Sequence, residues 1–234
     1  MVEGPVLAIE ALSSARAVTE VFADEALHVP DLEAAAIAAG VELTRVAAGG
    51  LDQILSTRTP QPVAAIVETV VHTVDDLPVD RPVLVAVDAQ DPGNAGALWR
   101  TAEASGCGGL VLAGNSVDST NPKVVRAAAG AALRLPVVAS PEPIALFAEL
   151  RAAGHAIVAS VVRGARSPET LDLTNAAIVL GNEANGLSQD VIDDADAVTT
   201  IELAGPTESL NVAAAGAVLC FESLRQRRVR VRRD

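Results

Sequence analysis

Residues 82–106 read PVLVAVDAQDPGNAGALWRTAEASG, and this stretch decides the fold class. It begins with a continuous apolar run, which is typical of a parallel strand buried on both faces. A loop rich in Asp, Gly, Pro and Asn follows, and the next segment predicts a helix that ends before Gly106. A strand that leads directly into a helix indicates a β-α-β unit.

The alternation continues to the end of the chain. Further strands are predicted at residues 108–114, 135–140, 155–162, 176–181 and 197–203. Helices are predicted at residues 121–132 and 143–154, shortly after Gly186, and finally from Glu208 to Arg227. Repeated alternation of this kind predicts an α/β domain whose parallel sheet has helices on both faces.

A smaller α/β unit precedes this domain. Strands are predicted at residues 18–23 and 41–47, a helix at residues 31–40, and a helix, a Pro-broken turn and a last strand within residues 51–68. The segment HTVDDLPVDRP is polar and contains proline, which favours a linker. We therefore predict a first domain at residues 1–71, a linker at 72–82 and a second domain at 83–234.

The charge is large and unevenly distributed. The formal net charge is −13, which argues against a protein that coats nucleic acid nonspecifically. The tail RQRRVRVRRD, from Arg225, holds six of the 17 basic residues. It is either an arm that binds nucleic acid or a solvated helix end whose arginines complement the helix dipole.

Composition also excludes several classes. No apolar run approaches the roughly 20 residues that span a membrane, and the first residues carry no signal pattern, so a cytoplasmic protein is predicted. Cys107 and Cys220 have no neighbouring Cys or His at metal-ligand spacing. We predict no metal site and expect both cysteines to be small buried residues.

Function is expected in three loops that follow strand ends, because ligands bind beyond the carboxyl ends of parallel strands. In the first loop, Asn94 is placed to cap the next helix, Gly96 allows close backbone approach, and Arg100 projects from the same side one turn later. Such an arginine clamps a phosphate or stabilises an oxyanion. The alternative is an ordinary capped helix with a surface arginine.

The second and third loops are GNEANGLS and AGPTESLN. Glycines bracket the second loop, whose backbone donors could hold the polar edge of a ligand, and Glu183 is either functional or a turn carboxylate facing solvent. Neither a Walker motif nor GxGxxG is present, which disfavours an ATP or NAD site. In the third loop, Ser209 and Asn211 could be local capping residues. The small-residue run VAAAGAVL after it predicts a tightly packed helix.

Together the loops resemble the SpoU/TrmH branch of the SPOUT RNA 2′-O-methyltransferases. Three family motifs occur in the family's order and spacing, and the resemblance covers about Val83 to Gln226. The first is matched by Asn94, Gly96, Arg100 and Gly106, the second by Gly181, Glu183 and Gly186, and the third by Ser209, Leu210, Asn211 and Val212.

Residues 1–71 are similar to the L30e-like substrate-binding domain that often precedes this catalytic domain. The resemblance rests on Glu3-Gly4-Pro5, on VFADE and on STRTPQPVAAIVE. In relatives a short basic segment usually precedes the Glu-Gly pair, so this chain is either shortened or lacks that segment. The two-domain layout, which is similar to thiostrepton-resistance-type enzymes, favours ribosomal RNA as the substrate over tRNA.

The resemblance implies a C-terminal trefoil knot, a homodimer with the final helix at its interface, and S-adenosylmethionine as cofactor. By motif position the cofactor pocket would comprise Leu180, Gly181, Asn182, Gly186, Ile201, Leu203 and Leu210. The reaction would transfer a methyl group to a ribose 2′-hydroxyl. A non-catalytic RNA-binding protein with this fold is the alternative, although the low aromatic content and the acidic charge disfavour base stacking.

Relatives assign the deprotonation of the hydroxyl to the arginine at position 100. Arginine ordinarily has a pKa above about 12 and is a poor general base. We therefore interpret Arg100 as a group that positions a phosphate and stabilises the developing alkoxide. The remaining predicted catalytic residues, which would orient Arg100 and the ribose, are Asn94, Glu183, Ser209 and Asn211.

Overall fold

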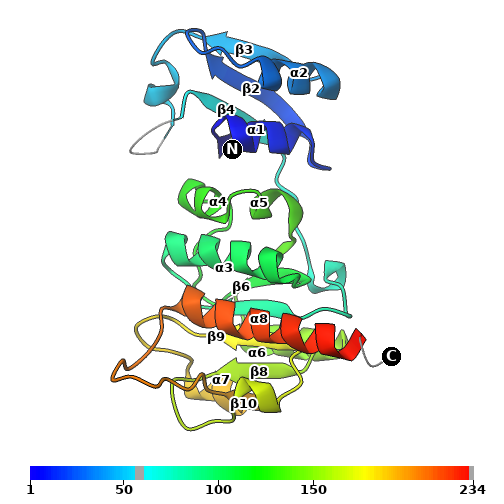
Figure 1. Cartoon of the computed structure of the whole chain (residues 1–234), viewed down its shortest axis with the longest axis vertical. Helices are drawn as coiled ribbons and strands as arrows, with labels where there is room; N and C mark the ends of the chain where they lie inside the picture. Colours follow the sequence, from blue (N-terminus) through cyan, green and yellow to red (C-terminus); the bar gives the residue numbers. More distant parts are fainter. Residues whose placement is uncertain (56–60, 232–234) are drawn as a thin grey trace.

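The computed structural model describes residues 1–55 and 61–231 and contains two β-sheets (Figure 1). The first sheet has four strands in the order β1-β4-β2-β3. Strand β2 pairs parallel with β3 and antiparallel with β4, so this sheet is mixed. Its strands are β1 (Val2–Glu3), β2 (Val18–Asp24), β3 (Leu43–Val46) and β4 (Val63–Val67).

Helices α1 (Pro5–Leu12) and α2 (Pro30–Ala39) pack against this first sheet around a small apolar core. Strands β2, β3 and β4 and helix α2 were predicted, whereas β1 and α1 were not. The helix expected after residue 50 is a 3-10 turn, Leu51–Gln53. Much of the predicted Pro-broken turn falls on residues 56–60, which lie outside the described residues.

The second sheet has six strands in the order β10-β8-β9-β5-β6-β7, and every pair is parallel, as predicted. The central pair is β5 with β9, which brings together two strands that are far apart in sequence. The strands are β5 (Val83–Val87), β6 (Gly109–Ala113), β7 (Val137–Ser140), β8 (Ile157–Ser160), β9 (Ala177–Leu180) and β10 (Ala197–Thr199).

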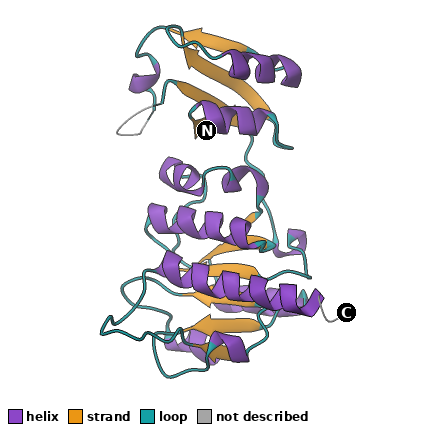
Figure 2. Ribbon diagram, in the orientation of Figure 1, coloured by secondary structure: helices purple, strands orange, loops and turns teal. Residues whose placement is uncertain are grey.

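Helices cover both faces of the six-stranded sheet (Figure 2). Alternate residues of a strand point to opposite faces. Leu84 accordingly belongs to the core under α3 (Pro92–Ser105) and α8 (Val212–Val231), whereas Val85 belongs to the core under α6 (Pro143–Ala152) and α7 (Gln189–Asp193). Burial on both sides explains why β5 is apolar throughout.

Two predicted helices differ from those observed. The helix predicted at residues 121–132 is divided into α4 (Pro122–Ala128) and α5 (Ala131–Arg134), because Ala129 adopts a positive φ of 51°. The last helix was predicted from Glu208 and begins four residues later. Asn211 caps it, accepting hydrogen bonds from the backbone N–H groups of residues 213 and 214 at 2.9 and 3.3 Å.

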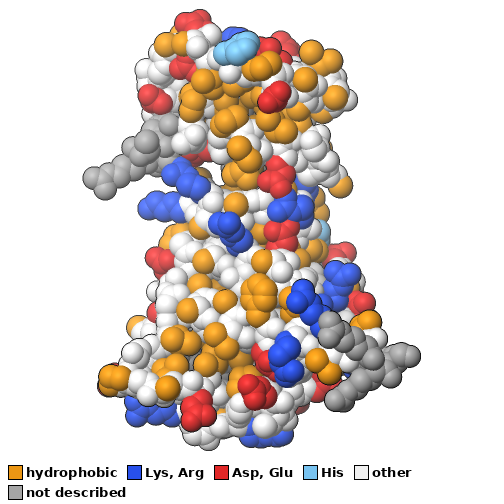
Figure 3. Space-filling view, viewed as in Figure 1, with side chains coloured by type: hydrophobic (Ala, Val, Ile, Leu, Met, Phe, Trp, Pro, Cys, Tyr) orange, Lys and Arg blue, Asp and Glu red, His pale blue; other side chains and the backbone are white. Residues whose placement is uncertain are grey.

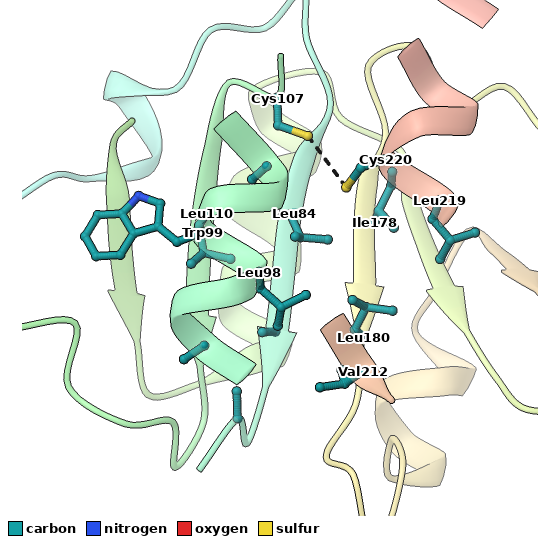
Figure 4. Close-up of a cluster of buried hydrophobic side chains, with 14 of the residues drawn as sticks. Leu84, Leu98, Trp99, Cys107, Leu110, Ile178, Leu180, Val212, Leu219 and Cys220 are labelled. Carbon is teal, nitrogen blue, oxygen red and sulfur yellow. Dashed lines mark hydrogen bonds between the residues drawn. The ribbon is translucent and has the colours of Figure 1, made fainter. Parts of the chain in front are cut away.

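The core between α3 and α8 is tightly packed (Figure 4). A Cβ added at Gly216 would lie 2.6 Å from Leu98 Cδ2, so the small residue at this position serves contact within the chain. Cys107 and Cys220 are buried, as predicted, with their Sγ atoms 3.8 Å apart. The hydrogen bond to Cys107 and burial raise the pKa of the Cys220 thiol, so Cys220 packs as a neutral thiol.

Helices α4 and α5 lie between the two sheets (Figure 1). Arg126 pairs with Glu3 at 3.1 Å, and Arg134 pairs with both Glu10 of α1 and Glu103 of α3. In the predicted linker, residues 74 and 77 are buried against the core of the second domain. The two boundaries of the predicted linker, at residues 71–72 and 82–83, stay predictions, as does the L30e-like character of the first unit.

The C-terminal segments relevant to the predicted knot lie close together. Residues 181–186, after β9, and residues 201, 203 and 208–210, before α8, line one cavity. The trefoil knot itself stays a prediction. Within residues 1–55 and 61–231, no helix is long and apolar enough to cross a membrane.

Candidate active site

A cavity of about 370 Å³ lies at the carboxyl end of the six-stranded sheet, in the size range of small-molecule sites. Its walls come from the segments that follow β8, β9 and β10 and from the first turn of α8. The last predicted strand is shorter than expected: residues 200–203 leave the sheet after β10, and two of them, Ile201 and Leu203, join the cavity wall.

All seven residues predicted to bind the cofactor lie in the wall of this cavity. Leu180, Ile201, Leu203 and Leu210 supply apolar surface, and residues 181–186 supply a backbone edge. Their role in binding a cofactor stays a prediction. Val212 of the third motif also lies in the wall, and the further wall residues, for which no role was predicted, are Ser160, Val161, Val162, Ala184, Asn185, Glu208 and Ala215.

Gly181 allows the backbone of the second loop to fold closely on itself. A Cβ at this position would lie 2.3 Å from the carbonyl carbon of Gly186 and 2.4 Å from the nitrogen of Leu187. Asn182 and Gly186 exchange two backbone hydrogen bonds across the loop, at 3.2 and 2.9 Å. Only glycine permits this approach, and the resulting loop presents its backbone to the cavity.

A chain of polar side chains joins the three predicted loops. The side-chain nitrogen Nδ2 of Asn94 donates to Glu183 Oε1 at 2.6 Å, and the side-chain nitrogen Nδ2 of Asn211 donates to Asn94 Oδ1 at 3.0 Å. Asn211 thus has two roles: its Oδ1 caps α8, as the capping interpretation predicted, and its Nδ2 contacts Asn94 of the predicted site. Amide orientations follow from the hydrogen-bond network.

Asn94 does not cap α3, contrary to the prediction. The helix begins at Pro92, and the cap is Asp91, whose Oδ1 accepts a hydrogen bond from the Asn94 backbone at 2.8 Å. Proline is favoured at the first helical position, so the helix starts before Asn94. The Asn94 side chain is thereby free to bridge the other two loops.

Two predicted catalytic residues are not part of this chain of hydrogen bonds. Ser209 lines the cavity. Arg100 is exposed on α3, about two and a half turns beyond Asp91, and is not one of the described residues that line the cavity. Burial raises the pKa of the Glu103 carboxyl, and the positive charge of Arg100 opposes that rise. The structure thus brings Asn94, Glu183 and Asn211 into contact but leaves Arg100 facing solvent.

The donor set fits an organic ligand better than a metal ion. Among residues 1–55 and 61–231, no group of three or more His, Cys, Asp or Glu side chains is placed to hold a metal. The cavity instead combines leucine and isoleucine side chains with backbone N–H and C=O groups. This combination suits a flat, partly apolar molecule with polar edges.

The sheet and its three loops define the class of protein. Residues 81–221, more than half of the chain, match the model of the SpoU rRNA Methylase family, and the chain belongs to that family. The predicted family is therefore confirmed.

Particular relatives extend the similarity to most of the chain. The 23S rRNA (guanosine(2553)-2′-O)-methyltransferase RlmP of Bacillus subtilis (strain 168) is 33% identical over 224 residues, covering 94% of this chain and 86% of that protein. The 23S rRNA (guanosine-2′-O-)-methyltransferase RlmB of Xylella fastidiosa is 35% identical over 207 residues, covering 84% and 83%. The crystal structure of the SpoU methyltransferase AviRb from Streptomyces viridochromogenes, in complex with AdoMet, superposes with a TM-score of 0.85 at 28% identity, covering 97% and 90%.

Proposed function

We propose that this chain is an S-adenosylmethionine-dependent methyltransferase that modifies a ribose 2′-hydroxyl in ribosomal RNA. The observation that carries the proposal is the cavity at the ends of β8, β9 and β10, whose wall contains all seven residues expected to bind the cofactor. The activity named for the RlmP and RlmB relatives, which this chain matches over most of its length, supports the same reaction and RNA class.

The cavity fits S-adenosylmethionine in both size and chemistry. Leu180, Ile201 and Leu210 would contact the apolar faces of the cofactor, and the backbone of residues 181–186 would bind its polar edges. A larger residue at Gly181 would clash with the backbone of Gly186 and Leu187 and so would open the loop. When bound, this cofactor supplies a methyl group on a positively charged sulfur, which makes the methyl carbon electrophilic.

The chain's own residues would bind and orient the ribose. Hydrogen bonds of 2.6 and 3.0 Å join Asn94 to Glu183 and Asn211 to Asn94 in a polar rim, and Glu183 and Ser209 line the cavity itself. Such a rim holds a hydroxyl in one direction and so favours in-line attack. Arg100, exposed on α3, would contact the RNA phosphate and stabilise negative charge on the 2′ oxygen.

We also propose a homodimer in which α8 lies at the interface. Its outward side carries Val218 and Phe221, whose exposed fractions are 44% and 48%. Figure 3 shows hydrophobic side chains around α8 and over the first sheet, and basic side chains between the two sheets, near the end of α8 and at the lower edge of the molecule. Exposed apolar area of this kind favours association. We place the enzyme in the cytoplasm, where ribosomal RNA is found.

The first domain would bind RNA beside the catalytic domain. The arginine tail contributes less than its composition suggests, because Arg225 pairs with Glu222 at 2.7 Å and Arg227 donates to two backbone carbonyls, those of Ser105 and Gly106. These contacts leave fewer arginines of the tail available to RNA, and the choice between an RNA-binding arm and a solvated helix end stays a prediction. Residues 232–234 lie outside the described residues.

The direct test is to incubate the protein with S-adenosylmethionine and either ribosomal RNA or tRNA, and to map 2′-O-methyl groups by mass spectrometry. One methylated position in ribosomal RNA supports the proposal, and methylation of tRNA alone would refute the substrate class. Calorimetry with the cofactor separates an inactive RNA-binding protein, which would show no binding at high micromolar concentration.

Arg100→Ala tests the role given to Arg100. We expect methyl transfer to fall by a factor on the order of 100 or more, the loss typical of removing one oxyanion-stabilising group, with cofactor affinity unchanged. Arg81→Ala is the matched control, because Arg81 is also exposed but precedes β5 at the opposite end of the sheet. Normal turnover in the Arg100 variant would remove this residue from the mechanism.

A further inference from the structure

Asp88 is an unusual residue directly after the central strand β5. Its φ is +54°, and Ala129 is the only other non-glycine residue with positive φ in residues 1–55 and 61–231. This left-handed conformation is unfavourable for most L residues, whereas Asp and Asn tolerate it best among them. Backbone strain of this kind persists only where surrounding contacts enforce it.

Three hydrogen bonds fix Asp88 to the ends of β6 and β9, the strands on either side of β5. Its backbone N–H donates to the carbonyl of Ala113 at the end of β6 at 3.0 Å, and its Oδ1 accepts from the Asn115 backbone at 2.7 Å. The Asp88 carbonyl accepts from the side-chain amide of Asn182 at 2.8 Å. A Cβ at Gly114 would lie 2.4 Å from Asp88 Oδ1, so the adjacent loop is shaped to admit this carboxylate.

Asn182 passes this constraint to the loop that forms the cavity wall. Its Oδ1 accepts hydrogen bonds from the backbones of Ala184 and Asn185 at 2.9 and 3.3 Å. Residues 181–186 all line the cavity. The side chain of Asn182 is thus held at one end by the Asp88 carbonyl, while its other end organises the loop.

We propose that Asp88 is a positioning residue for cofactor binding, an inference that rests on the proposed function. The left-handed turn directs the carbonyl of Asp88 toward Asn182, and the Asp88 carboxylate locks that turn onto the loop after β6. Asp88 is not one of the described residues that line the cavity, so it acts through Asn182, which does line it. The side chain of Asp88 gives no sign of this role in the sequence, because the contact with Asn182 is made by its main chain.

Three substitutions at Asp88 separate the contribution of its left-handed backbone from that of its side-chain acceptor. Asp88→Asn keeps both the left-handed preference and an oxygen acceptor, Asp88→Gly keeps only the backbone conformation, and Asp88→Ala keeps neither. We expect the Kd for S-adenosylmethionine to rise on the order of tenfold in the alanine variant, about threefold in the glycine variant, and less than about twofold in the asparagine variant.

The matched control is Asp172→Ala. Asp172 also accepts a backbone hydrogen bond within its own turn, from Thr174 at 3.0 Å, and it lies outside the cavity wall. Its removal tests whether the loss of any such turn weakens the binding of the cofactor. We expect the Asp172 variant to bind S-adenosylmethionine as the unaltered chain does.

Calorimetry and steady-state methylation assays then decide. A positioning role raises the KM for the cofactor with kcat little changed, because Asp88 does not contact the reacting atoms, whereas a merely structural role lowers the active fraction with KM unchanged. Folded Asp88→Ala with the original Kd, or with only kcat reduced, overturns the inference. If that variant does not fold, Asp88→Gly decides, and an unaltered Kd there also overturns it. Absence of cofactor binding by the unaltered chain would instead refute the proposed function, and this inference with it.

Discussion

Replacing Gly181 with alanine tests whether the close loop approach creates the cofactor site. The added methyl group would lie 2.3 Å from the carbonyl carbon of Gly186. Ordinary contact begins at 3.4 Å, so the two sides of the loop must separate by at least about 1.1 Å. The backbone hydrogen bonds between Asn182 and Gly186, now 3.2 and 2.9 Å, would then exceed hydrogen-bonding distance.

The size of the effect follows from these contacts. Losing two hydrogen bonds of about 0.5–1.5 kcal/mol each destabilises the loop by about 1–3 kcal/mol, the same range as overpacking elsewhere in proteins. If the cofactor binds only the closed loop, its Kd rises between about fivefold and about 150-fold. If the loop unfolds together with the rest of the domain, this loss of stability lowers the melting temperature by about 2–4 °C per kcal/mol.

The assay is calorimetric titration of S-adenosylmethionine together with a thermal melt. Gly50→Ala is the matched control: its Cβ would lie 2.6 Å from Val46 Cγ1 and 2.9 Å from the Ala47 carbonyl, yet it belongs to the first domain. We expect both variants to lose stability, and only Gly181→Ala to lose cofactor affinity. An unchanged Kd in folded Gly181→Ala, or an equal loss of affinity in both variants, would refute the reasoning.

Three further predictions concern pH, assembly and RNA. Hydrogen bonds from Thr174 lower the pKa of Asp172, so its stabilisation is present above the ordinary carboxyl pKa of about 4 and is lost as the pH falls below it. Asp172→Ala should therefore lower the melting temperature at pH 7 more than at pH 3, and equal losses would contradict this. Phe221→Glu should yield monomers in light scattering, whereas Val71→Glu, at a site 87% exposed in the first domain, should not; a monomeric unaltered chain would refute the interface. Because several arginines are neutralised by carboxylates, log K for RNA against log salt should have a slope shallower than about −4, and a steeper slope would indicate more phosphate contacts.

The second domain could be predicted from sequence because its local patterns agree with its tertiary structure. The strand β5 is apolar along its whole length, and it lies at the centre of a sheet covered on both faces. The motif residues after β5, β9 and β10 could be placed at one edge of the sheet, since all parallel strands end there. The pairing of β5 with β9 could not be predicted from pattern, because sheet order depends on long-range packing.

The errors have local physical causes. A helical pattern at residues 121–132 predicted one helix, but the positive φ of Ala129 divides it, and no glycine or proline occupies that position. Asn94 was predicted to cap α3, but Asp91 and Pro92 start the helix three residues earlier. The wall residues 160–162 carried no signal, because they lie at the end of an ordinary buried strand, β8, and line the cavity only through the sheet order.

Asn94 connects the helix that carries Arg100 with the loops that line the cavity, which the sequence motifs present as separate segments. It is fixed by the cap of α3, which also carries Arg100, and its side chain contacts Glu183 on the cavity loop and Asn211 at the start of α8. A movement of the cavity loop therefore acts directly on the first turn of the helix that bears Arg100. We expect binding at the cavity and the orientation of α3 to be coupled through these two side-chain hydrogen bonds, so a substitution at Asn94 should change both cofactor affinity and methyl transfer, whereas Arg100→Ala should reduce methyl transfer alone.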